Sequence, residues 1–144
     1  ENTRNTIRRL WQVDYIPIVN ENDTVAIEEI MLGDNDKLSA LVAVITEADL
    51  LVLISDIDGI FDCNPHLHPE AHLINEVNDL EQVRSYIEEK KSTLGTGGMS
   101  SKIHAAEICM KHGIEMWIVN GQRPSCIINA MQSQIPFTRF RKNR

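Results

Sequence analysis

The chain has 144 residues, of which 42% are hydrophobic and 5% aromatic, and its formal net charge is −7. This length suits one globular domain that buries roughly two-thirds of its unfolded surface, and the hydrophobic share excludes a disordered chain. The negative charge argues against a nucleic acid or membrane surface as partner, and no apolar run approaches the length of a membrane span. Three scattered cysteines without Cys-x-x-Cys spacing fit a reducing cytoplasm.

The spacing of apolar residues predicts alternating helices and strands along the chain. In the first half of the chain we expect a helix over 3–13, a strand over 16–19, a helix over 36–47, a strand over 50–54 and a turn-rich stretch over 56–69. In the second half we expect helices over 79–89 and 101–112, a strand over 116–119 and a helix over 124–131. Alternation of this kind predicts a parallel-rich α/β sheet with helices on both faces.

Several single residues refine this prediction. The strand over 50–54 is apolar throughout and is expected to be buried on both faces, as in parallel sheets. Pro17 places the strand over 16–19 at an edge or a strand start, and Gly113 is a helix C-cap. Trp11 and Trp117 lie on apolar faces and are expected in the core.

The most informative stretch for function is Gly-Thr-Gly-Gly-Met-Ser-Ser-Lys, residues 95–102. Its glycines let the backbone approach an anion closely, and a helix that begins directly after them adds the positive end of its dipole. Lys102 adds a mobile cation. The order of residues does not match a Walker A loop, which needs Gly before the Lys and Ser or Thr after it. We therefore expect a phosphate-binding loop of another kind, with a capped surface loop as the alternative.

Two polar clusters strengthen the case for a binding site. Gly-Asp-Asn-Asp at 33–36 precedes a predicted helix, and its three polar side chains exceed the single residue that a helix cap requires. Asn-Glu-Asn-Asp at 20–23 follows a predicted strand, where open α/β sheets bind ligands. Taken singly, each cluster also fits ordinary turn chemistry.

Two other stretches of the sequence contain candidate sites. Asp56-Ile57-Asp58-Gly59 after a strand is similar to the nucleophile motif of haloacid-dehalogenase-like phosphatases. Such enzymes need Mg²⁺-binding acidic residues further down the chain, whereas the only Gly-Asp-x-Asp motif here lies upstream, at 33–36. Asp58 is instead expected to cap a turn. A zinc site is a second possibility, but the spacing fits no common closed site; its ligands would be Cys63, His66, His68 and His72.

Taken together, the motifs resemble the glutamate 5-kinases of the amino acid kinase family, in family order and spacing from about Asn2 to Phe140. The motifs that carry the resemblance are Asn20-Glu21-Asn22-Asp23, Gly33-Asp34-Asn35-Asp36 with Leu38-Ser39-Ala40, Ser55-Asp56 with Gly59, and Gly95 to Lys102. The resemblance implies a carbamate kinase-like three-layer fold and ATP-dependent phosphorylation of the γ-carboxylate of L-glutamate, the first step of proline biosynthesis, in the cytoplasm.

The resemblance also implies roles for individual residues. Lys102 stabilises charge on the transferring phosphoryl group, Asp36 orients the lysines, and Mg²⁺ bridges the phosphates of ATP. The residues implied to bind glutamate are Asn20, Asp23, Asp34 and Asn35, and those implied to bind the nucleotide are Ser55, Asp56, Thr96, Gly97, Gly98, Met99, Ser100, Ser101 and Lys102. No protein ligand set for a resident metal is expected.

The resemblance places residues 1–144 in the C-terminal, nucleotide-binding part of one amino acid kinase domain, so that the fold is incomplete at its N-terminus. Family members carry a Lys and a Gly-Ser loop upstream, and many continue into a small RNA-binding-type domain that is not expected in this chain. A homo-oligomer is also implied. One departure is Phe137, where the family has Gly before its Thr-x-Phe sequence.

Two alternatives stay open at this stage. The chain fits another family member, such as an aspartate or N-acetylglutamate kinase, although an N-acetylated substrate has no ammonium group to pair with Asp23. It also fits a non-catalytic fragment or binding module. A carboxylate acceptor is ionised at neutral pH and needs no general base, which agrees with the lack of a candidate catalytic histidine.

Overall fold

The computed structural model describes residues 2–20, 35–65, 67–84 and 97–142. The elements are α1 (Asn2–Gln12), α2 (Asn35–Thr46), β1 (Leu50–Ser55), β2 (Glu76–Val77), α4 (Gly97–Lys111), β3 (Glu115–Asn120), α5 (Cys126–Met131) and β4 (Thr138–Phe140). Residues 81–84 are also helical and match part of the helix predicted over 79–89, whose remainder lies outside the described residues.

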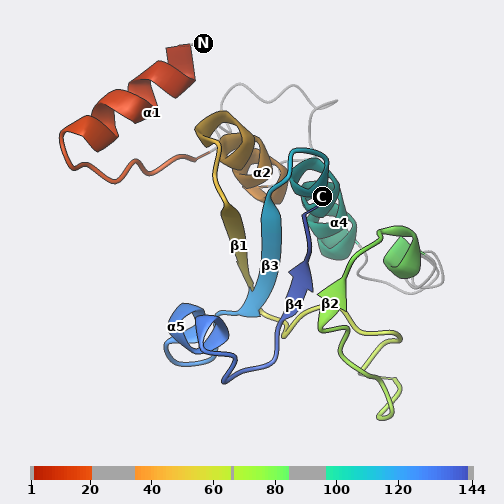
Figure 1. The fold of residues 1–144 in the computed structure, drawn as a ribbon. Helices are drawn as coiled ribbons and strands as arrows, with labels where there is room; N and C mark the ends of the chain where they lie inside the picture. The colour runs from red at the N-terminus through yellow and green to blue at the C-terminus, as the bar shows by residue number, and fades with distance from the viewer. Residues whose placement is uncertain (1, 21–34, 66, 85–96, 143–144) are drawn as a thin grey trace.

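The four strands form one mixed sheet in the order β1-β3-β4-β2. β1 pairs with β3 in parallel over its whole length, from Leu50 opposite Glu115 to Ser55 opposite Asn120. β2 and β4 are also parallel, whereas β3 and β4 are antiparallel. The parallel pairing of β1 and β3 brings their carboxyl ends to the same edge of the sheet (Figure 1).

Helices cover both faces of this sheet. α2 and α4 lie side by side on one face (Figure 1), and the core there includes Ala40 of α2, Ala106 of α4 and the alternate β3 residues Met116 and Ile118. On the other face, Trp117 and Val119 of β3 pack with Ala130 of α5 and with Phe137. Alternate side chains of β3 therefore pack into two separate hydrophobic cores, one on each face of the sheet. The predicted sheet between helix layers is confirmed.

Some predictions about single elements were wrong. The expected strand over 16–19 is coil, and Ile18 is 95% exposed, since no strand runs beside this segment among the described residues. Trp11 is 46% exposed instead of buried, because α1 lies apart from the sheet beyond α2 (Figure 1). β1 is buried unevenly, with Ile54 57% exposed, because it is an edge strand of the described sheet.

Other predictions concerned the ends of helices and strands and the burial of Trp117. β2 was not predicted, since two residues are too few for a periodic pattern. α5 begins at Cys126, two residues later than predicted. Gly113 has φ 69°, as its predicted role of C-cap after α4 requires. Trp117 is buried as predicted, and Phe137 packs on it with ring centroids 4.8 Å apart.

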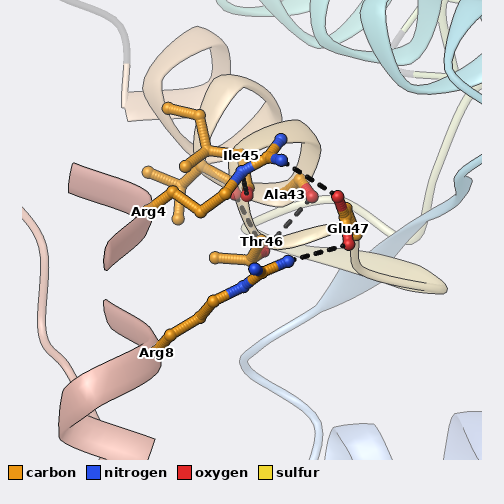
Figure 2. A network of polar contacts seen from close by, with 7 residues as sticks. Arg4, Arg8, Ala43, Ile45, Thr46 and Glu47 are labelled. Carbon is orange, nitrogen blue, oxygen red and sulfur yellow. Dashed lines mark hydrogen bonds and ion pairs between the residues drawn. The ribbon is translucent and has the colours of Figure 1, made fainter. Parts of the chain in front are cut away.

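A small polar network attaches α1 to the C-terminal end of α2 (Figure 2). Arg4 donates from Nε to the Ile45 carbonyl at 3.0 Å, and Arg4 and Arg8 pair with Glu47 at 3.1 and 3.3 Å. A cation near the free carbonyls of a helix C-terminus is favourable. These ion pairs are largely exposed, so each stabilises the fold only slightly.

Candidate active site

The order of elements gathers several predicted site residues at one edge of the sheet. α2 leads through a short turn into the start of β1, and α4 leads through Gly113 into the start of β3. Each helix therefore runs back along the strand that follows it, and its N-terminal end lies toward the carboxyl edge of the sheet (Figure 1). Open α/β sheets bind ligands at this edge.

The central contact of the site joins α2 to α4. The Lys102 ammonium lies 2.9 Å from Oδ2 of Asp36, and both side chains are mostly buried, at 15% and 18% exposure. The Ser101 hydroxyl lies 2.8 Å from the same carboxylate oxygen and 2.9 Å from the Gly98 carbonyl. The carboxylate thus holds a cation and a hydroxyl at the start of α4, where the helix dipole also favours an anion.

The glycine-rich stretch differs from its prediction. We expected a loop over 95–102 with a helix from 101, but α4 begins at Gly97. Gly97, Gly98, Met99 and Ser100 are therefore the first helical residues, and their N–H groups are those that a helix leaves without internal partners. Met99 packs against the core and Ser101 is buried beside Asp36, so tertiary contacts stabilise a helix start that glycine alone would disfavour. Thr96 lies outside the described residues.

The other predicted site residues are placed as follows. Ser55 ends β1 at the carboxyl edge, and its hydroxyl lies 3.2 Å from Oδ1 of the exposed Asp56. Asn20 and Asn35 line one cavity of about 480 Å³ between residues 17–20, α2 and β1, whose walls are otherwise mainly apolar. Asp23 and Asp34 lie outside the described residues.

One cluster at the same edge was missed by the sequence analysis. Asp58, predicted to cap a turn, instead accepts two hydrogen bonds from Arg123, both at 2.7 Å, and a third from Asn120 at 3.0 Å. Its bond to Arg123 is the main reason why the pKa of Asp58 lies below its usual value, and Asp58 raises the pKa of Arg123 in turn. The polar run Asn-Gly-Gln-Arg that follows a strand was the available signal.

Zinc binding by Cys63, His66, His68 and His72 was not expected from their spacing, and His66 lies outside the described residues. No group of three or more His, Cys, Asp or Glu side chains suited to a metal occurs within the described ranges, which leave out His66. Instead, His68 pairs with Glu70 at 3.2 Å and His72 with Asp62 at 3.4 Å, all on the surface. In the part of the chain that the structure describes, no helix is long and apolar enough to cross a membrane.

Comparison with known proteins identifies the family. The model of the amino acid kinase family matches residues 1–120. This chain belongs to the amino acid kinase family. It is 47% identical over 135 residues to the glutamate 5-kinase of Desulfitobacterium hafniense, covering 94% of this chain and 37% of that protein. It is 48% identical over 140 residues to the glutamate 5-kinase of Clostridium acetobutylicum, covering 96% and 52%.

Solved structures of similar fold also match this chain. The UMP kinase of Ureaplasma parvum matches with a TM-score of 0.65 over 96% of this chain and 53% of that one, at 15% sequence identity. The predicted amino acid kinase fold is thereby confirmed. In both comparisons the chain spans about half or less of the length of the protein it matches.

Proposed function

We propose that this chain forms the nucleotide-binding part of an ATP-dependent kinase that phosphorylates the γ-carboxylate of L-glutamate, the first step of proline biosynthesis. Its similarity to glutamate 5-kinases over 94–96% of its length supports the substrate. The observation that carries the chemistry is the Lys102–Asp36 pair at the start of α4, at the ligand-binding edge of the sheet.

In this proposal the helix start and Lys102 act together on the phosphates. Phosphoryl transfer to a carboxylate brings two anions together, so catalysis depends on positioning and on charge stabilisation. The N–H groups at the start of α4, for which a helix provides no internal partner, bind a phosphate, and Lys102 stabilises the transferring group. Asp36 holds the ammonium in place and lowers the entropy lost when it engages the phosphate. The acceptor carboxylate needs no general base.

Mg²⁺ would enter as part of the MgATP substrate and would supply positive charge to its phosphates. The described residues suit this role, because Lys102 and the N–H groups at the start of α4 are donors for the phosphates. Ser55 and Asp56, which also lie at the carboxyl edge, are proposed to contact the nucleotide. Asn20, Asp23, Asp34 and Asn35 are proposed to bind glutamate; the cavity lined by Asn20 and Asn35 supports a shared role for those two.

The test uses the complete protein that contains these residues. Glutamate-dependent release of ADP, with the acyl phosphate trapped by hydroxylamine, should occur, whereas aspartate and N-acetylglutamate should give little product. Turnover of either of these acceptors in preference to glutamate would assign the chain to another branch of the family. Calorimetric titration with MgADP and glutamate separates an enzyme from a non-catalytic module, which should bind neither. A cytoplasmic location, a homo-oligomeric state and the assignment of residues 1–144 to one kinase domain stay predictions.

A further inference from the structure

The loop that follows β1 is attached to the loop that follows β3 by several contacts. The N–H of Gly121 donates to the Ser55 carbonyl at 2.8 Å, directly beyond the last paired residues of the two strands. Asn120 and Arg123 then hold Asp58, which lies three residues after Ser55. Residues 120–123 therefore hold the chain at Ser55, where β1 ends, and again at Asp58, the third residue of the loop.

The contact between these loops is close. A side chain at position 121 would collide with the Ile54 side chain, so Gly121 allows the two loops to approach. At the far end of the loop, the Thr138 hydroxyl accepts a hydrogen bond from the Ile60 N–H at 2.8 Å. The segment from Ser55 to Ile60 is thus held on both sides of Asp56, while Asp56 itself is exposed to solvent.

The Asp58–Arg123 pair has the geometry of a positioning contact. Two parallel N–H···O bonds of 2.7 Å between guanidinium and carboxylate define both distance and orientation. Nε and one terminal nitrogen of Arg123 are used by Asp58, which has a further donor in Asn120. Arg123 is therefore directed toward the loop.

We propose that Arg123 is a positioning residue for nucleotide binding, and that it acts through Asp58 by holding Ser55 and Asp56 in the conformation that contacts ATP. This inference rests on the proposed function, since it assumes that the loop after β1 binds the nucleotide. A loop held in its bound conformation loses less entropy on binding. Loss of the pair should therefore weaken the binding of nucleotide and leave the binding of glutamate unchanged.

The test compares Arg123→Ala, Asp58→Asn and the double variant in the complete protein. Each single variant should raise the KM for ATP on the order of tenfold, as expected for one lost charge-assisted contact, with little change in kcat or in the KM for glutamate. The double variant should be no worse than either single variant, because both remove the same contact. Calorimetric titration with MgADP should show the same loss of affinity without turnover.

Two controls separate this role from others. Arg141→Ala removes an arginine that is about as exposed as Arg123 and that pairs with Glu76 at 2.9 Å. It should lower the thermal midpoint about as much as Arg123→Ala does, and it should leave the KM for ATP unchanged. Arg123→Lys keeps the charge but loses the paired geometry, so it should behave like Arg123→Ala.

Three outcomes would overturn the inference. They are an unchanged KM for ATP in Arg123→Ala, an effect of Arg123→Ala that Asp58→Asn does not share, and full rescue by lysine, which would indicate direct contact between Arg123 and a phosphate. The proposed function fails separately, if the unmodified protein neither binds MgADP nor phosphorylates glutamate.

Discussion

Lys102 and Asp36 are 66 residues apart in the chain, yet the Lys102 ammonium lies 2.9 Å from the Asp36 carboxylate. The pair joins the N-terminal turns of α2 and α4, so it holds together the two helices that cover one face of the sheet. A mostly buried cation that a carboxylate holds in place is suited to stabilising charge in phosphoryl transfer.

Lys102→Ala should lower kcat much more than it changes KM, because the charge of Lys102 matters most in the transition state. Loss of one such electrostatic donor predicts a decrease on the order of 10²-fold or more. Steady-state kinetics of the complete protein would measure it. Lys111→Ala, at the opposite end of α4 and paired with Glu107, is the matched control and should keep normal kcat. A near-normal kcat in Lys102→Ala would remove Lys102 from the mechanism.

Asp23→Asn should weaken the binding of glutamate by roughly 1.5–3 kcal/mol, the range for a hydrogen bond to a charged group. The reason is that a carboxylate beside an anionic substrate is favourable only if it binds the substrate ammonium. Binding of MgADP, measured by calorimetry on the same variant, should hardly change. A loss of nucleotide affinity instead would assign Asp23 to the other substrate.

Thr138→Val should destabilise the fold, because the fully buried Thr138 hydroxyl accepts from the Ile60 N–H and donates to the Ile74 carbonyl at 2.7 Å. Valine has a similar shape but leaves the buried Ile60 N–H and the partly buried Ile74 carbonyl without that partner, at a cost of roughly 2–4 kcal/mol. Urea denaturation would show the loss. The same substitution at Thr46, whose hydroxyl bonds within α2, should cost well under half as much. Equal losses at both positions would contradict this account.

Cys109 should resist alkylation in the folded protein, because burial raises the pKa of its thiol to about 11 and blocks access. At pH 8, iodoacetamide should label the partly exposed Cys63 and Cys126 and reach Cys109 only after denaturation; peptide mapping by mass spectrometry would detect this. The raised pKa has a consequence for stability. The contribution of the buried, neutral Cys109 thiol to the free energy of unfolding is complete below the ordinary thiol pKa of 9.0. It is lost as the pH rises toward about 11. Rapid labelling of Cys109 in the native state would contradict its burial.

Residues 1–144 expressed alone should not catalyse phosphoryl transfer. Lys102 supplies charge on one side of the phosphates, and the family resemblance places a second Lys and a Gly-Ser loop upstream. β1, with Ile54 exposed, has one strand neighbour among the described residues, and such an edge promotes aggregation. Activity should return in the complete protein or with a separate upstream segment. Robust glutamate-dependent ADP release by soluble residues 1–144 would show that the upstream segment is dispensable.

The sequence by itself determined the local features of this protein. Periodicity located α1, α2, β1, α4 and β3 to within a few residues, except for the start of α4, because helix and strand periods are local properties of the chain. Gly113 was recognised as a C-cap because it lies between a predicted helix and a predicted strand, and glycine is the residue that most often ends a helix. The glycine-rich stretch and the Asp36 cluster pointed to phosphate chemistry before any contact between them was known.

The tertiary structure determined which distant residues of the chain are in contact. The register of β1 against β3 sets Ser55 opposite Asn120, and the loops that follow these residues bring Arg123 to Asp58, 65 residues away. The prediction of a strand over 16–19 failed because strand formation needs a neighbouring strand, which local sequence does not reveal. α4 begins at Gly97, earlier than the predicted start at 101, because Met99 packs against the core and Ser101 contacts Asp36. Hydrogen bonds and ion pairs between distant segments depend on packing, and packing is a property of the whole fold.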